Sequence, residues 1–267
     1  MLGKLIKHEF RATTRVMLPL FAALLLSAAA ANLAVRNLNT ELSRILSILN
    51  TFVIVIFAVL MISAGVMSIV VMVSRFHKNL LTGEGYLMFT LPVTTHGLIW
   101  SKIIVSTIWF ALCCVAMLLA GVVMALDVHW IKSVFTELPG FLKEVFSAVP
   151  AGHAALYILE LLLLFFVYAA GVCLTFYAPC SIGYSFSRRK GLMSVLSFLL
   201  LQFIVNYIGI ASLVRIDQMP WSFLDNIENM FVVGELVLLL MIGAQALYCA
   251  LTYFITWYFL EKRLNLE

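Results

Sequence analysis

The sequence contains few charged residues. Charged side chains make up 11% of the 267 residues, whereas hydrophobic side chains make up 64%. A soluble domain contains about 25% charged and about 45–50% apolar residues. The composition therefore excludes a soluble globular enzyme, a disordered chain and a nucleic-acid-binding protein. The net charge of +4 is then an orientation signal for a membrane protein and not a basic patch for a polyanion.

The sequence also lacks the motifs of metal, disulfide and nucleotide sites. Its five cysteines all lie inside apolar stretches, so they form neither a disulfide framework nor a spaced set of metal ligands. The five histidines form no His-Glu-x-x-His pattern, and no Gly-x-x-x-x-Gly-Lys-Ser/Thr is present to hold the phosphates of ATP. We therefore expect this chain not to be an enzyme and to carry no cofactor of its own.

The sequence does contain six long apolar runs. Crossing the hydrocarbon core takes about 20 apolar residues, and in lipid such a run must be a helix because every backbone polar group needs an internal partner. We predict an all-α polytopic membrane protein that forms a single transmembrane domain over residues 1–267. The predicted spans are 16–35, 48–73, 103–126, 154–182, 192–214 and 231–260.

The distribution of Lys and Arg predicts the orientation. Twelve of the 17 Lys and Arg residues fall on one side of the predicted membrane, and the positive-inside rule places that side in the cytoplasm. An even number of spans puts both termini there. The basic start and Ala28-Ala29-Ala30 imitate a cleavable signal peptide, but the apolar run is longer than a usual signal core, so we interpret it as a true span.

Residues 1–15 show the pattern of an interfacial helix. Lys4, Lys7, Arg11 and Arg15 recur at spacings of three, four and four, which places them on one helical face. Apolar residues occupy another face, as in helices that lie in the membrane surface. The alternative is an ordinary basic flank of the first span.

The cytoplasmic segment 75–102 is long for a loop that only joins two helices. It contains bulky apolar side chains, and Gly83 and Gly85 interrupt its middle. Pro92 then precedes a short segment in which Thr94 and Thr95 are candidate helix caps. An exposed apolar segment of this kind favours docking into another protein. The alternative is that it packs on the membrane surface by itself.

The stretch Gly83-Glu84-Gly85-Tyr86-Leu87-Met88-Phe89-Thr90-Leu91-Pro92-Val93-Thr94, followed by Ser101-Lys102, resembles the loop after the second span of ABC-2 type transporter permeases. The six-span layout and the amphipathic N-terminal helix match that family too. Thr95-His96-Gly97 stands where the family usually has an Arg or Lys. The resemblance implies that this loop is a coupling helix that fits a groove on a separate ATPase subunit. The expected coupling residues are Glu84, Gly85, Tyr86, Leu87, Phe89, Leu91, Pro92, Val93, Thr94 and His96.

The resemblance also implies the partners. Two ABC ATPase subunits would bind ATP and Mg, and a second copy of the chain or a sister permease would complete the pathway in a bacterial plasma membrane. The expected function is that of the membrane subunit of an ATP-driven exporter. The rival function is a six-span scaffold or channel-like protein without an ATPase partner. The sequence leaves the substrate open.

Two carboxylates fall within predicted spans, both near the outer side. Glu160 lies roughly 9 Å and Glu235 roughly 6 Å from the outer ends of their spans, at a rise of 1.5 Å per residue. A charge at that depth needs water, a partner or a proton. The two side chains either line an outward cavity that engages a cationic or amphipathic substrate, or each one reaches the nearby interface or stays protonated because it is buried.

Two further features are compatible with a pathway. Gln202 and Asn206 lie four residues apart on one face of the fifth span, where they either line the pathway or join helices by hydrogen bonds. The external segment 127–153 has apolar residues at helical spacing, which predicts amphipathic helices that lie on the membrane or cap the external mouth.

Overall fold

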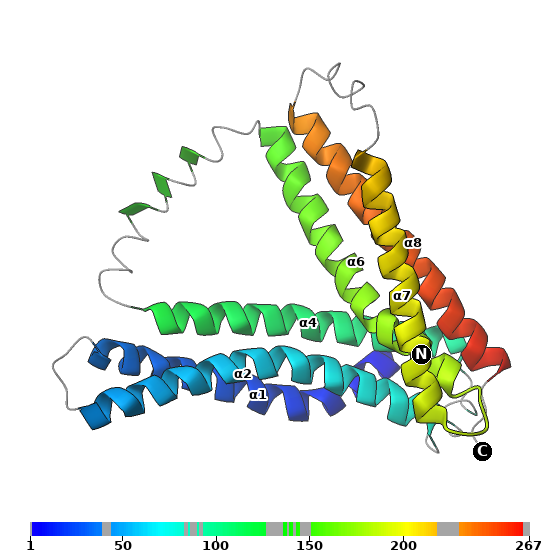
Figure 1. The fold of residues 1–267 in the computed structure, drawn as a ribbon, viewed down its shortest axis with the longest axis horizontal. Helices are drawn as coiled ribbons and strands as arrows, with labels where there is room; N and C mark the ends of the chain where they lie inside the picture. The colour runs from blue at the N-terminus through cyan, green and yellow to red at the C-terminus, as the bar shows by residue number, and fades with distance from the viewer. Residues whose placement is uncertain are drawn as a thin grey trace. The chain divides into compact units, whose positions relative to one another are not determined.

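The computed structural model describes residues 2–38, 44–82, 85, 90, 93–126, 136–137, 139–140, 143–144, 151–217 and 230–263. Within these ranges the regular structure is entirely helical, with no strand. The long helices, shown in Figure 1, are α1 (Leu2–Leu38), α2 (Arg44–Phe76), α4 (Thr95–Ala125), α6 (Ala151–Gly183), α7 (Lys190–Asp217) and α8 (Met230–Lys262). A π-helical turn, η1 (His77–Leu81), follows α2 directly.

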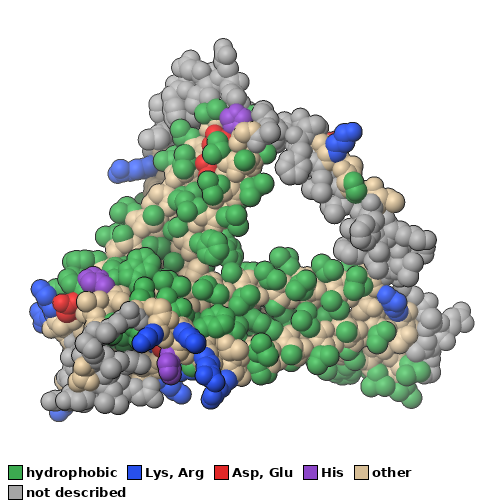
Figure 2. Space-filling model, turned by 180° about the vertical axis from the view of Figure 1, so that it is seen from behind, with side chains coloured by type: hydrophobic (Ala, Val, Ile, Leu, Met, Phe, Trp, Pro, Cys, Tyr) green, Lys and Arg blue, Asp and Glu red, His purple; other side chains and the backbone are tan. Residues whose placement is uncertain are grey.

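Six helices of the described part of the chain are long and apolar enough to cross a membrane. Figure 2 shows that hydrophobic side chains cover much of the helix surfaces, while Lys and Arg side chains gather in small groups. Leu26, Phe203 and Ile45, for example, each expose 72% of their surface. In water such exposure would be unfavourable, but lipid tails are as apolar as these side chains. The chain is therefore a multi-pass membrane protein.

The helices divide into two compact units, Met1–Met72 with Ile104–Ser147, and Val73–Ile103 with Ala148–Glu267. The first unit contains α1 and most of α2 and α4. Its core includes small side chains from all three helices, which let the helix backbones approach closely. The buried residues of this cluster are Leu24, Ala28, Ala31, Phe57, Ala64 and Ala120.

A second cluster of the first unit surrounds Trp109 of α4. The indole Nε1 of Trp109 donates a hydrogen bond of 2.7 Å to the buried hydroxyl of Thr13, and Phe10 stacks on the same ring at 4.9 Å. Met17 is fully buried beside them. The first turns of α1 are therefore packed on α4 through one face.

Asn32 joins α1 to the end of α4. Its side-chain amide donates to the carbonyl oxygens of Met124 at 2.8 Å and Leu126 at 2.7 Å. The last carbonyl groups of a helix have no partner within the helix, so this amide satisfies two acceptors at once.

In the second unit, α6 packs against both α7 and α8. Glycines of α6 and α8 allow close approach at three points. A Cβ atom on Gly171 would collide with Gln245, one on Gly183 with Ser194, and one on Gly234 with Tyr157.

The helices extend beyond the apolar runs that predicted them. The sequence predicted an interfacial helix over 1–15 and a separate span over 16–35, whereas α1 continues without a break from Leu2 to Leu38 and includes Pro19. Similarly, α4 begins at Thr95, eight residues before the predicted 103. Hydropathy marks only the part of a helix that lies in hydrocarbon, whereas the backbone hydrogen bonds of a helix continue until a cap or a breaker ends them.

Candidate functional site

The start of the predicted coupling segment is attached to α6 and the turn after it. Phe76, the last residue of α2, stacks on Tyr177 with ring centroids 4.0 Å apart and an angle of 7° between the planes. Both side chains are fully buried. The next residue, His77, forms a hydrogen bond between Nε2 and the hydroxyl of Tyr184, just after the end of α6.

Tyr184 has two further neighbours. The ammonium group of Lys190, the first residue of α7, lies 5.8 Å from the centre of the Tyr184 ring, within the range of a cation–π contact. Burial raises the pKa of the Tyr184 phenol above its usual value, and Cys180 adds to that effect. The phenol therefore stays neutral and can donate to or accept from His77.

The end of the segment begins α4 with a helix cap. The hydroxyl of Thr94 accepts a hydrogen bond from the backbone N–H of Gly97 at 3.3 Å. This is the N-cap geometry, in which a side-chain oxygen satisfies a free amide of the first turn. Thr94 was one of two candidate caps in the sequence.

The first turn of α4 is attached to the last turns of α8. The ring of His96 stacks on Trp257 at 5.2 Å and on Tyr253 at 5.9 Å, with interplanar angles of 13° and 17°. Its Nδ1 forms a hydrogen bond of 2.7 Å with the Tyr253 hydroxyl. One residue earlier, the hydroxyl of Thr95 donates to a carboxylate oxygen of Glu261 at 3.3 Å. Both ends of the segment between His77 and His96 are thus held on helices of the second unit.

The structure describes only some of the predicted coupling residues. Gly85 is buried, and its amide donates to the carbonyl of Thr82 at 2.7 Å. Val93 is half-buried, and Thr94 is exposed. The remaining predicted coupling residues lie outside the described ranges: Glu84, Tyr86, Leu87, Phe89, Leu91 and Pro92.

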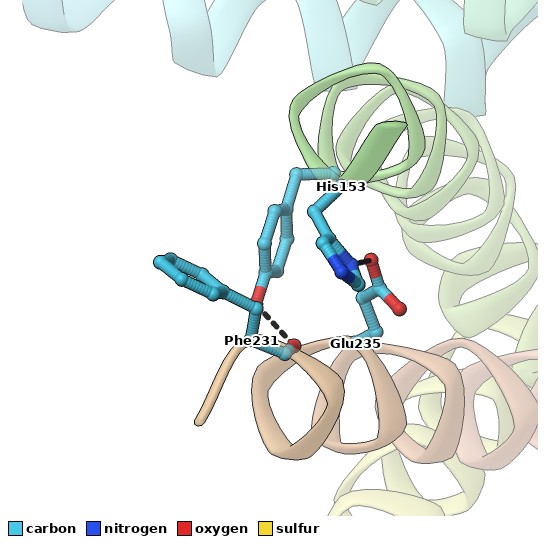
Figure 3. A network of polar contacts seen from close by, with 4 residues as sticks. His153, Phe231 and Glu235 are labelled. Carbon is cyan, nitrogen blue, oxygen red and sulfur yellow. Dashed lines mark hydrogen bonds and ion pairs between the residues drawn. The ribbon is translucent and has the colours of Figure 1, made fainter. Parts of the chain in front are cut away.

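At their N-terminal ends, α6 and α8 are joined by a polar network (Figure 3). Nδ1 of His153 lies 2.7 Å from Oε1 of Glu235, and the two side chains are 24% and 15% exposed. The imidazole also stacks on Phe231 at 5.8 Å. The hydroxyl of Tyr157 donates to the carbonyl of Phe231 at 2.6 Å. Sequence reasoning missed His153 as the partner of Glu235, because His153 lay outside the apolar runs and no spacing links residues on different helices.

Glu160 is placed differently from Glu235. It is 9% exposed, and its Oε2 has no hydrogen-bond partner among the described residues. Tyr157 and Gly171 contact α8, and Glu160 lies between them at spacings of three and eleven, on the same helix face. The two predicted pathway carboxylates therefore have different surroundings, since Glu235 has a histidine partner and Glu160 is buried with no partner for its Oε2 among the described residues.

A shallow groove of about 340 Å³ lies further along α6 and α8. Its walls are apolar, with Tyr168 and the amide of Gln245 as the polar groups. Gln245 was missed by the sequence analysis, although a single amide in an apolar run is a signal that could have found it. The lining residues are Leu161, Leu164, Phe165, Tyr168, Met241 and Gln245.

The remaining predicted residues lie on α7 and α1. Gln202 is half-buried and Asn206 is exposed on α7, and no residue of the described apolar window of α7 is buried within the chain. The four cations Lys4, Lys7, Arg11 and Arg15 are all exposed on α1.

The described residues contain no group of three His, Cys, Asp or Glu side chains that could hold a metal ion. The candidate site therefore has two parts in the second unit. One is the set of contacts that holds the predicted coupling segment on α6 and α8, and the other is the polar network of His153 and Glu235 at the N-terminal ends of these helices. No family model, curated protein or solved structure matches the chain.

Proposed function

We propose that this chain is the membrane-spanning permease subunit of an ATP-driven ABC exporter in a bacterial plasma membrane, with both termini in the cytoplasm. The observation that supports the proposal most strongly is the attachment of the predicted coupling segment at both ends. Its first end is held by Phe76 and His77, and its last end by Thr95 and His96. These contacts tie the position of the segment to α6 and α8.

The attachments suggest how movement of the segment reaches the helices. A separate ATPase, which binds ATP and Mg, would displace the segment when its subunits close. The displacement would act on the C-terminal end of α6 through Tyr177 and Tyr184, and on the C-terminal end of α8 through Tyr253 and Trp257. Because α6 and α8 pack along their length, the opposite ends of the two helices would move as well. ATP binding can favour one arrangement only if the ATPase binds that arrangement more tightly.

The opposite end carries the groups that such a movement would change. The His153–Glu235 pair and the bond from Tyr157 to Phe231 hold the N-terminal ends of α6 and α8 together. Separation of these ends would free the carboxylate of Glu235 and expose the buried acid Glu160. We propose that this is the outward-facing end of the pathway.

Two copies of the chain, or one copy and a sister permease, would enclose the pathway. This part of the proposal is supported by α7, whose apolar window buries no residue within the chain. The amide of Asn206 is exposed on that helix. In lipid an amide side chain is more stable when it forms hydrogen bonds with another helix.

The test compares two single substitutions of phenylalanine by aspartate. Phe89→Asp places a charge in the predicted docking segment. Phe186→Asp places the same charge in the turn between α6 and α7, where Phe186 is 44% exposed. Membranes from cells that express the tagged chain at native level are solubilised in a mild detergent. The measurements are ATP hydrolysis in the purified fraction and the presence of a subunit with a Gly-x-x-x-x-Gly-Lys-Ser/Thr motif.

We expect the wild type and Phe186→Asp to retain the ATPase, and Phe89→Asp to lose it while eluting as the same monodisperse membrane protein. Loss of the ATPase in both variants would show that the docking surface is not the predicted segment. A well-folded wild type without ATPase in several mild detergents would refute the exporter and favour the scaffold or channel-like protein.

A further inference from the structure

The N-terminal turns of α1 carry a strongly basic face. Lys4, Lys7, Arg11 and Arg15 are exposed, and none has an ion-pair partner within the described part of the chain. The only acid in these turns, Glu9, is buried on another face. Three of the cations border a shallow groove of about 610 Å³ whose floor is partly apolar. The lining residues are Gly3, Ile6, Lys7, Phe10, Arg11, Thr14 and Arg15.

The cations of this face repel one another. Lys7, Arg11 and Arg15 recur at spacings of four residues, and like charges at that spacing on a helix are destabilising. A bound anion would relieve this repulsion.

The depth of two of the arginines matches the phosphate layer of a bilayer. Arg15 directly precedes Val16, the first residue of the apolar run. Arg11 lies about 6 Å further out along the helix, at 1.5 Å per residue. The headgroup region on each side of the hydrocarbon is about 5–7 Å thick. A lipid phosphate beside this helix would therefore lie between the two guanidinium groups.

The side chains around the arginines also suit the acyl chain and the headgroup of a lipid. On the hydrocarbon side, Val16 and Leu18 are 47% and 64% exposed, which offers an apolar surface for an acyl chain. On the groove floor, Phe10 is held in place by its stacking on Trp109. The hydroxyl proton of Thr14 is donated to the carbonyl of Phe10, so the donors available to a phosphate are those of the basic side chains.

We propose that Lys7, Arg11 and Arg15 form a binding site for the phosphodiester of an anionic phospholipid such as phosphatidylglycerol. Each guanidinium can donate two parallel hydrogen bonds to the phosphate oxygens. This site would bind lipid whether or not the chain transports a substrate. It would bind the anionic lipid in preference to a zwitterionic one of the same chain length, because the choline group of phosphatidylcholine places a second cation in the basic groove.

The experiment measures lipid binding to the full chain by native mass spectrometry in a neutral detergent. Dioctanoyl phosphatidylglycerol and dioctanoyl phosphatidylcholine are titrated into the wild type, Arg11→Gln/Arg15→Gln and Arg188→Gln/Arg189→Gln. The last variant is the matched control, because it removes two exposed arginines from the turn between α6 and α7. Arg11→Lys/Arg15→Lys keeps the positive charges and removes the planar guanidinium groups. If the glutamine variant does not elute as one species, lipid binding to this lysine variant is compared with the wild type in its place.

We expect the wild type to bind phosphatidylglycerol more tightly than phosphatidylcholine. Each cation near a lipid surface contributes about 1 kcal/mol, so the loss of Arg11 and Arg15 should weaken phosphatidylglycerol binding about thirty-fold. The lysine variant should weaken it by a smaller factor, and the Arg188/Arg189 control should bind as the wild type does.

Three results would overturn the proposal. The first is an equal loss in the Arg11/Arg15 and Arg188/Arg189 variants, which would indicate unspecific attraction by the total charge. The second is unchanged binding in the Arg11/Arg15 variant and its lysine counterpart. The third is displacement of the lipid by an equal concentration of inorganic phosphate or glycerophosphoglycerol, which would identify a site for soluble phosphates.

Discussion

The contact between Tyr157 and Gly234 allows a sharp test of the packing of α6 on α8. A Cβ atom added to Gly234 would collide with the Tyr157 hydroxyl oxygen, and would lie 3.2 Å from the ring carbon that bears it. The same hydroxyl donates to the carbonyl of Phe231. In Gly234→Ala the added methyl group overpacks the contact between α6 and α8, and the tyrosine hydroxyl, which bonds to Phe231 of α8, loses its hydrogen bond.

The expected magnitudes follow from these contacts. Alanine is favoured over glycine within a helix by about 1 kcal/mol. Overpacking costs about 1–3 kcal/mol of stability. Loss of the hydrogen bond costs about 0.6 kcal/mol on average and at most about 1.7 kcal/mol. We therefore expect Gly234→Ala to lower the free energy of unfolding by about 1–2 kcal/mol. Tyr157→Phe should lower it by about 0.6–1 kcal/mol, because only the hydrogen bond is lost.

The double variant separates this explanation from a general loss of stability. In Tyr157→Phe/Gly234→Ala the obstructing oxygen is absent, and the nearest remaining atom is the ring carbon at 3.2 Å, which must yield by only a few tenths of an ångström for the helix to gain its alanine. The double variant should be as stable as Tyr157→Phe or more stable, with a coupling energy of at least about 1 kcal/mol. The assay is unfolding in mixed micelles of increasing sodium dodecyl sulfate content, followed by circular dichroism. Gly243→Ala is the control, because nothing lies within 4 Å of its Cβ position. Strictly additive effects of the two substitutions would refute the contact.

Three further predictions use the same unfolding assay. Tyr177→Ala should destabilise the chain by about 3–5 kcal/mol because it empties a buried site beside Phe76, whereas Tyr168→Ala on the same helix, at a side chain 61% exposed, should change stability by less than about 0.5 kcal/mol; equal effects would contradict the burial. Asn32→Ala should cost about 1–3 kcal/mol, since it removes both amide hydrogen bonds and leaves the Met124 carbonyl without its side-chain donor, whereas the Leu126 carbonyl still accepts from Arg36; Asn32→Asp should not restore the loss. Gly171→Leu should force α6 and α8 apart and cost at least about 1–3 kcal/mol; a neutral result would show that Gln245 does not occupy the space beside Gly171.

The sequence was sufficient to predict the helices but not the contacts between them. Six apolar runs predicted six spans, and six such helices are present in the described ranges. Their ends differ because apolar character follows the lipid boundary, whereas the backbone of α1 remains helical through the basic residues from Leu2 onward. The orientation of the termini stays a prediction that rests on the Lys and Arg count.

The partners of the polar residues could not be predicted, because they come from helices far apart in the chain. Glu235 was recognised as a membrane carboxylate, but its partner His153 is 82 residues away. His96 was assigned to ATPase docking from its place in the segment, and the structure adds its stacking on Trp257 and Tyr253. Nothing in the local pattern around His96 signals those two rings. Only the fold brings α4 and α8 together at that point.

The attachment of His77 and His96 has a consequence for the thermodynamics of any docking by the residues between them. A segment that is free at one end loses much of its conformational entropy when a partner orders it. When both ends are already fixed on α6 and α8, part of that loss has occurred during folding. The ordering of the segment then opposes association by a smaller free energy, so the partner binds more tightly. Substitutions at the two histidines would therefore weaken binding even of a partner that touches neither side chain.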